Sequence, residues 1–144
     1  MGWAYLRGRT AQADARRMTL IDTSTVVAWL DEDHVDHKAS TFAVIQALEE
    51  DEVAVSVVTL AELAAGGRTR EAIAQDLRGM TVVEVTADDA WLAGRVFART
   101  PRKQLAPLPD FFIRAQAAER GWKHLTNDRR RLTWWPEVEF IFGN

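Results

Sequence analysis

Strand-like apolar runs alternate with segments of helical periodicity along most of this chain, and this alternation constrains the fold more than any other feature. Residues 53–58, VAVSVV, form a β-branched run that is typical of a strand buried in a parallel sheet. Residues 36–50 place apolar side chains at the spacing of one helix face. Strands separated by helices indicate an α/β fold with a mainly parallel sheet.

The remaining elements follow from similar patterns. Residues 86–100 begin with threonine and two early acids, which favour a helix start, whereas Gly66 and Gly67 are typical of a helix end. Strands are predicted at 20–21, 53–58, 81–85, 124–126 and 138–142, and helices at 24–31, 36–50, 59–67, 70–79, 86–100 and 110–120.

The composition suits one globular domain. The chain has 144 residues, of which 47% are hydrophobic and 27% charged, so global disorder is not expected. It contains no cysteine, which excludes disulfides, thiolate nucleophiles and cysteine-based zinc sites. A chain without disulfides suits a reducing compartment, and we expect a cytoplasmic protein. No apolar run approaches the ~18 residues of a membrane-spanning helix, so no membrane partner is expected.

The formal net charge of −3 gives the whole chain no attraction for nucleic acid. A polyanion would have to meet a local basic face, or a face made cationic by bound metal. The arginines at 129–131 are one candidate for such a face, although they also suit a solvated turn. A proline-punctuated loop adds Arg99, Arg102 and Lys103.

Residues 1–17, MGWAYLRGRTAQADARR, differ from the rest because they are rich in arginine and show no clear periodicity. They run directly into a second methionine, Met18. We interpret them as a disordered N-terminal extension that reflects an upstream start or a segment introduced for expression. An arginine-rich transit peptide is the alternative. The folded domain is predicted to span residues 18–144.

One carboxylate, Asp22, stands where a buried strand gives way to a helix in the stretch LIDTSTVVAWL, residues 20–30. A charged group is rarely left at such a place unless it is paired or binds a cation. Neither a turn nor a helix cap requires Asp22, because Ser24 is available as the cap. Asp22 is therefore the strongest single indication of a functional site.

Three more acids follow strands or open helices, namely Glu62, Asp110 and Asp128. Ligands of parallel sheets bind beyond the carboxyl ends of the strands, so these acids and Asp22 should converge at one edge. Four carboxylates without a nearby lysine repel one another, and a divalent cation relieves that repulsion. Ligation by oxygen alone suits Mg²⁺ or Mn²⁺ rather than zinc.

Each of these three acids also has a purely structural interpretation. Glu62 lies three residues after Thr59, so TLAE matches a capping box. Asp110 precedes an apolar run and suits the N-cap of a helix, and Asp128 suits a turn. The alternatives stay open for each residue alone, whereas the four acids together favour a metal site.

The stretches LIDTSTVVAWL, SVVTLAEL and LPDFFIRAQAAERGWKHLTND, with the gaps between them, resemble a PIN domain, and most of all a VapC-type toxin of a bacterial toxin–antitoxin pair. The resemblance covers residues 18–142. It implies a compact three-layer α/β/α domain that binds Mg²⁺ or Mn²⁺ and hydrolyses RNA phosphodiester bonds. The acids of the family correspond to Asp22, Glu62, Asp110 and Asp128.

In this interpretation Asp22 and Asp128 contact the metal, and Glu62 and Asp110 bind it directly or through water. The ion would neutralise the scissile phosphate and activate a coordinated water for in-line attack. Asp110 at a helix start would also lie near amide N–H groups that help to hold an anion.

Several neighbouring residues are predicted to support this chemistry. Ser24 would bind a metal-bound water or a phosphate oxygen, cap the following helix, or do both. The Thr126 hydroxyl is predicted to orient Asp128. Arg129 and Arg130 are predicted to contact the RNA backbone, with a solvated turn as the alternative.

Two residues depart from the family pattern. Arg114, one turn past Asp110, stands where relatives with LPDFFI commonly have glycine, and there it would contact a carboxylate or a phosphate. Asn127 stands where a basic residue is frequent, which weakens a phosphate contact. Arg114 keeps one alternative open, a catalytically impaired PIN-fold module that binds nucleic acid or protein, although the presence of all four acids speaks against it.

The resemblance also implies partners. VapC-type proteins commonly form homodimers and are silenced by a small antitoxin whose C-terminal segment lies across the active-site groove. Apolar side chains on the predicted helices provide surface for such contacts, although a place in the core is the alternative for each; they are Trp29, Phe42, Trp91 and Phe97.

Two other kinds of site also begin with an aspartate after the first strand. Phosphotransfer of the haloacid dehalogenase type needs D-x-D, but residue 24 is serine. A metal-dependent adhesion module needs D-x-S-x-S, and the pattern fails at Val26. Neither kind fits this sequence.

Overall fold

The computed structural model describes residues 18–101, 107–130 and 132–144. The predictions for residues 1–17, Arg102, Lys103 and Arg131 lie outside this part of the chain. The strands are β1 (Met18–Ile21), β2 (Glu52–Ser56), β3 (Thr81–Val83), β4 (Lys123–Thr126) and β5 (Phe140–Phe142). The helices are α1 (Thr23–Leu30), α2 (His37–Glu50), α3 (Val57–Ala65), α4 (Arg70–Asp76), α5 (Ala87–Arg99), α6 (Leu108–Arg120) and the 3₁₀ helix η4 (Leu132–Trp134).

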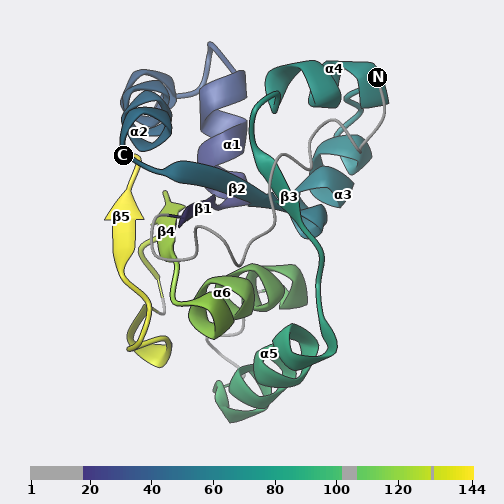
Figure 1. Cartoon of the computed structure of the whole chain (residues 1–144), viewed down its shortest axis with the longest axis vertical. Coiled ribbons are helices and arrows are strands. Elements are labelled where there is room, and N and C mark those ends of the chain that lie inside the picture. Colours follow the sequence, from purple (N-terminus) through teal and green to yellow (C-terminus); the bar gives the residue numbers. More distant parts are fainter. Residues whose placement is uncertain (1–17, 102–106, 131) are drawn as a thin grey trace.

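The five strands form one sheet in the order β3-β2-β1-β4-β5, and every neighbouring pair is parallel (Figure 1). The chain first builds outward from β1 through β2 to β3, and then crosses to β4 and β5 on the other side of β1. Parallel neighbours need such crossover connections, which here contain helices. Ile21 pairs with Leu125, so the carboxyl ends of β1 and β4 lie side by side.

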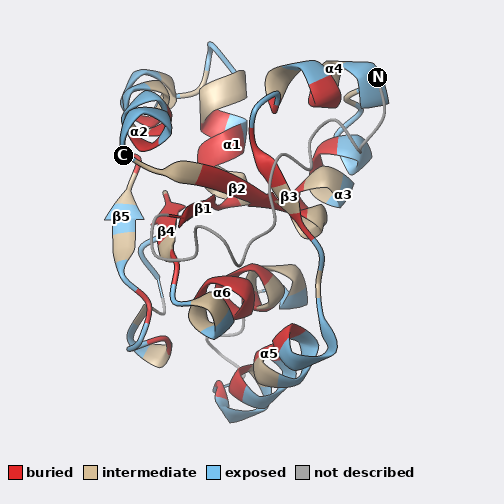
Figure 2. Ribbon diagram, in the orientation of Figure 1, coloured by how far each residue is buried: buried red, intermediate tan, exposed pale blue. Residues whose placement is uncertain are grey.

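Helices cover both faces of the sheet (Figure 1). Side chains alternate between the faces along β1, so Leu20 packs with the core of α5 and α6 while Ile21 packs with that of α1 to α4. Both side chains are fully buried. Figure 2 shows the buried residues concentrated along the sheet and on the inner sides of the helices. The predicted three-layer α/β/α architecture is confirmed.

Helices α1 and α3, which follow β1 and β2, begin earlier in the chain than predicted. The helix predicted at 24–31 starts at Thr23, so Asp22 rather than Ser24 occupies its N-cap position. The helix predicted to start at Thr59 begins two residues earlier, because the Ser56 side chain caps it by accepting the Val58 N–H. The predicted capping box in TLAE is therefore wrong.

The helix predicted to start at Asp110 begins at Leu108, and Pro107 occupies its N-cap position. Proline residues near a helix start carry a preset φ and need no N–H partner there. Asp110 consequently lies inside the first turn, and its predicted role as N-cap is wrong. The strands predicted at 81–85 and 138–142 are shorter than expected; both are edge strands, which pair on one side only.

Candidate active site

The predicted acids gather at the carboxyl edge of the sheet, close to where the strand order reverses. Asp22 directly follows β1, and Asp128 lies shortly after β4. Glu62 belongs to α3, the helix after β2, and Asp110 belongs to the first turn of α6. Ligand sites of parallel sheets lie at such a reversal. The fold thus brings acids from four separate segments to one edge.

Asp22 is buried, and two hydroxyl groups orient its carboxylate. Ser24 Oγ and Thr126 Oγ1 donate to Oδ2 at 2.9 Å and 2.7 Å. The Asp22 backbone N–H donates to the Leu125 carbonyl at 2.7 Å, which continues the pairing of β1 with β4. Although Asp22 sits at the N-cap position of α1, its side chain makes no capping hydrogen bond. The two hydroxyls, not the helix end, hold the carboxylate.

Thr126 links Asp22 to Asp128. Its hydroxyl donates to Asp22 and accepts the backbone N–H of Asp128 at 3.0 Å. Thr126 therefore contacts Asp128 through the main chain of that residue. Ser24 makes a second link between Asp22 and the loop after β4, because its hydroxyl donates to Asp22 and accepts the Asn127 N–H at 3.1 Å. Ser24 is thus a first-turn residue that holds the site together, and its predicted role as helix cap is wrong.

Glu62 is half-buried and accepts a hydrogen bond from Thr23 Oγ1 at 2.8 Å. Thr23 also shares a hydrogen bond with the hydroxyl of Thr59 at 2.9 Å. Thr23 is the residue after Asp22, so this network joins α1 to α3 beside that carboxylate. Thr59 is fully buried and contributes to this junction rather than to a helix cap.

Asp110 shows electrostatically that the acids lie near one another. Burial and the charges of Asp22, Glu62 and Asp128 raise the pKa of Asp110 from 3.8 to about 6, against a lowering effect from Arg114. Like charges raise the pKa of a carboxyl group strongly only over short distances. The four acids therefore share one region of negative potential.

Two arginines engage Asp128. The exposed Arg130 donates to it from Nε at 2.9 Å and from Nη2 at 3.3 Å. Arg114 is only 3% exposed, and its Nη2 lies 3.5 Å from Oδ2 of Asp128. Burial alone would raise the pKa of Asp128, but the hydrogen bonds from Arg130 and the charge of Arg114 hold that pKa below its usual range. Asp128 is therefore ionised and bound to cations of its own chain.

His124 is a neighbour of the site that the sequence did not reveal. It is fully buried in β4, and its Nε2 lies 3.9 Å from Oδ1 of Asp22. Burial lowers the pKa of His124 to about 4 despite the opposing charge of Asp22, so the imidazole is neutral at pH 7. Its ring packs edge-on against Phe140 at 5.6 Å between centroids. No local pattern marks this residue, because its approach to Asp22 depends on strand pairing.

Arg129, predicted to contact the RNA backbone, and Asn127, which stands where a basic residue is frequent, both have partners within the chain. Asn127 Nδ2 donates to Ser40 at 2.8 Å, and Asn127 Oδ1 accepts from Thr25 at 2.9 Å. The Arg129 guanidinium lies 4.0 Å from the centre of the Phe142 ring. These side chains tie the loop after β4 to α1, α2 and β5.

The donors of this site suit a hard divalent cation. The predicted ligands are all carboxylates, which hard cations such as Mg²⁺ prefer. The imidazole of His124, which lies beside Asp22, is fully buried. As the side chains stand, no three histidine, aspartate or glutamate residues in the described part of the chain are grouped to hold one ion. Metal binding therefore requires the carboxylates to close in, and for Asp128 this means releasing arginine contacts.

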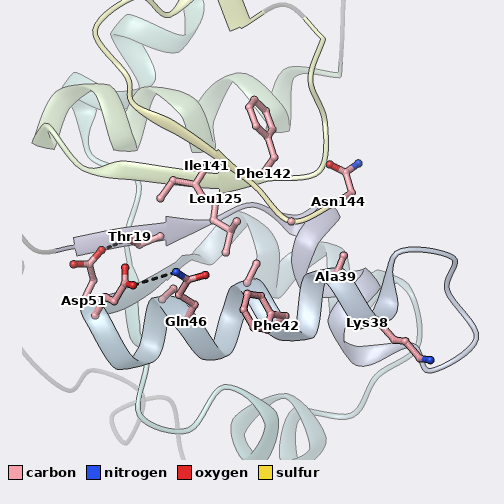
Figure 3. Close-up of a pocket in the computed structure, with 14 residues that line it drawn as sticks. Thr19, Lys38, Ala39, Phe42, Gln46, Asp51, Leu125, Ile141, Phe142 and Asn144 are labelled. Carbon is pink, nitrogen blue, oxygen red and sulfur yellow. Dashed lines mark hydrogen bonds between the residues drawn. The ribbon is translucent and has the colours of Figure 1, made fainter.

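A separate apolar hollow of about 520 Å³ lies between α2 and β5, and Figure 3 shows the side chains around it. Phe42 from α2 and Ile141 from β5 line it and are 69% and 37% exposed. Among the other predicted surface aromatics, Trp91 is exposed, whereas Trp29 and Phe97 are partly buried against the core. Within the described residues, no helix is long and apolar enough to cross a membrane.

The chain is similar to a known family in sequence and to known structures in fold. Residues 19–134 match the model of the PIN domain, whereas no curated protein gives a significant match. The fold is similar to a chain of VapBC2 from Rickettsia felis bound to promoter DNA, with 17% identity, a TM-score of 0.68, and coverage of 87% of this chain and 98% of that chain.

Two further solved structures are similar over comparable lengths. A chain of a toxin–antitoxin complex from Klebsiella pneumoniae has 18% identity and a TM-score of 0.66, with coverage of 88% of this chain and 98% of that chain. A chain of VapBC-5 from Mycobacterium tuberculosis has 27% identity and a TM-score of 0.55, with coverage of 88% and 97%. Because the family model matches most of the sequence and the fold agrees, the chain belongs to the PIN-domain family.

Proposed function

We propose that this protein is a Mg²⁺- or Mn²⁺-dependent endoribonuclease that acts as the toxin of a toxin–antitoxin pair. One observation carries the proposal: Asp22, Glu62, Asp110 and Asp128 come from four separate segments to one edge of the sheet, where burial and the other three charges raise the pKa of Asp110 to about 6. Carboxylates that lie this near one another repel and lower the stability of the fold, and a bound cation relieves that repulsion. Such groups with a shifted pKa are typical of functional sites. Membership of the PIN-domain family and the likeness to chains of VapBC complexes support the same function.

A divalent ion bound by these carboxylates would neutralise the scissile phosphate and lower the pKa of a coordinated water. Asp22 is the proposed central ligand. Ser24 and Thr126 fix its Oδ2, while no hydrogen bond within the described residues reaches Oδ1. Glu62, Asp110 and Asp128 complete the proposed ligand set, directly or through water.

Arg130 is the described basic residue that best suits a contact with RNA. Its side chain is 72% exposed and lies beside Asp128, so the guanidinium can turn outward toward a phosphate at little cost. Arg114 is enclosed, and Arg129 is stacked on Phe142. We propose that Arg130 supplies the main phosphate contact at this edge.

The proposed protein partners are a small antitoxin and a second copy of this chain. The similar solved structures from Rickettsia felis and Mycobacterium tuberculosis are VapBC assemblies. Apolar surface for such contacts is available at Phe42, beside the hollow between α2 and β5, and at Trp91 on α5. Co-expression with a candidate antitoxin, followed by purification and light scattering, tests both partners.

A second candidate function is supported by the arginines on Asp128. If Arg114 and Arg130 hold that carboxylate throughout, the site does not assemble around a metal, and the protein would bind RNA or a partner without cleaving it. RNA binding in EDTA together with no cleavage in any metal would favour this alternative.

The deciding experiment is cleavage of a total RNA preparation by purified protein. We expect cleavage in Mg²⁺ or Mn²⁺, its loss in EDTA, and its recovery when metal is restored. Asp22→Asn should be inactive, and Asp33→Asn, which changes an exposed acid elsewhere on the surface, should match wild type. Cleavage that persists in EDTA, or an active Asp22→Asn protein, would rule out the metal-dependent mechanism.

A further inference from the structure

Arg114 is a buried cation among the acids of the site. It lies on α6 one turn past Asp110 and is 3% exposed. Its Nη2 lies 3.5 Å from Oδ2 of Asp128, and its Nη1 donates to the Arg130 carbonyl at 3.3 Å. Its charge also acts on Asp110, where it opposes the rise in pKa. Arg114 thus interacts electrostatically with at least two of the four acids.

Arg114 and Arg130 differ in how easily they leave Asp128. Arg130 is mostly exposed, so water and salt screen its charge and the side chain can turn into solvent. Arg114 is enclosed by the protein, and a buried guanidinium without a counter-ion is costly. The guanidinium of Arg114 therefore stays in the site, whether or not a metal ion or RNA is also bound. The same enclosure keeps RNA phosphates from reaching Arg114 as it stands.

A fixed positive charge at this position opposes the binding of a second cation. It attracts Asp128 away from any ion at Asp22, and it repels that ion directly through a medium of low dielectric constant. The charge of Arg114 also neutralises part of the negative charge of the four acids. This explains how the acids can lie near one another when no metal is bound. In the described residues, no three acids or histidines lie close enough together to hold one metal ion as they stand.

We propose that Arg114 is a positioning residue that acts as an internal counter-cation of the acid cluster, competing with divalent metal for Asp128 and weakening metal binding. This inference rests on the proposed metal-dependent function. It predicts that the protein binds metal more weakly than its four carboxylates alone would allow, and that a neutral side chain at position 114 reverses this deficit.

The test is the dissociation constant of Mn²⁺, measured by calorimetry at fixed ionic strength and pH 7.5. We expect Arg114→Met, which keeps much of the side-chain volume, to bind Mn²⁺ about tenfold more tightly than wild type, because one enclosed unit charge is removed. Arg114→Gln, which retains N–H donors, should show the same direction. Arg114→Lys keeps the charge and should stay near wild type. Arg130→Met, the matched change at the exposed arginine, should alter affinity less than about threefold.

Circular dichroism melts establish which variants are folded, and Arg114→Gln serves if Arg114→Met is not. A folded neutral variant with unchanged or weaker Mn²⁺ affinity would overturn the inference. If wild-type protein binds Mn²⁺ and cleaves RNA while a folded neutral variant shows no gain in affinity, only the inference about Arg114 is wrong. Wild-type protein that neither binds Mn²⁺ nor cleaves RNA would instead refute the proposed function.

Discussion

The hydroxyl of Thr126, at the end of β4, donates a 2.7 Å hydrogen bond to Oδ2 of Asp22, just after β1. Both residues are buried, and the same hydroxyl accepts the backbone N–H of Asp128. One oxygen atom therefore connects two of the four acids, one through its carboxylate and the other through its main chain. The geometry of the site depends on this contact between neighbouring parallel strands.

Thr126→Val should destabilise the protein. Valine keeps the shape but removes the hydroxyl, which leaves the Asp128 N–H and part of the Asp22 carboxylate without this partner. We expect a loss of about 1–3 kcal/mol in the free energy of unfolding, measured by urea titration in EDTA. Thr126→Ser restores the hydroxyl and should recover much of the loss. Equal stabilities of the valine and wild-type proteins would show that the hydroxyl is not important.

Asp22→Asn should separate a metal site from a purely structural aspartate. The amide oxygen can still accept from Ser24 and Thr126, and the charge leaves a crowded cluster, so in EDTA this variant should be as stable as wild type or more stable. Asp22→Ala removes the acceptor and should lose about 1–3 kcal/mol. Mn²⁺ should raise the melting temperature of wild type, because it binds the folded state, but not that of either variant. A wild-type metal response in Asp22→Asn would contradict the proposed site.

Asp110 should make the metal-free protein less stable as the pH rises. Its folded pKa of about 6 lies above the ordinary value of 3.8, so the folded state holds this proton more tightly than the unfolded chain. The contribution is absent below about pH 4 and complete above about pH 6. Asp110→Asn should therefore gain about 1 kcal/mol at pH 7.5, after discounting for solvent screening of a partly exposed group.

Thermal melts of both proteins in EDTA, at several values from pH 4 to pH 8, check this prediction. The stability difference between Asp110→Asn and wild type should vanish near pH 4. A difference that is constant across this range would mean that the effect does not come from the titration of Asp110.

Gly143→Ala should disturb the loop that carries Asp128. An alanine Cβ at this position would overlap Oδ1 of Asn127, while the Gly143 carbonyl accepts a hydrogen bond from Ser40 at 2.8 Å. We expect a loss of about 1–3 kcal/mol, as for overpacking in a core. In an Asn127→Ala background the same change should cost clearly less, because the clash is gone. A double-mutant cycle measured by urea unfolding gives the coupling, and strictly additive losses would argue against a direct contact.

The placement of the acids was predictable because it depends on local pattern and on one general rule. Asp22 follows an apolar run and Asp128 follows another, and parallel strands align their carboxyl ends at one edge of the sheet. The helix starts were less predictable. Serine and threonine are both common N-cap residues, so Ser56 and Thr59 were both candidates. Ser56 is the cap because β2 ends at this residue and α3 begins directly after it.

The sequence by itself determined the α/β alternation, the order of the elements and the acids that fall at strand ends, because these depend on residue periodicity and on near neighbours in the chain. The tertiary structure decided which side chains meet. The contact of Thr126 with Asp22, the bond of Asn127 to Ser40 and the burial of Arg114 beside Asp128 join distant segments. Their partners are set by the register between strands and by helix packing, which no local pattern encodes.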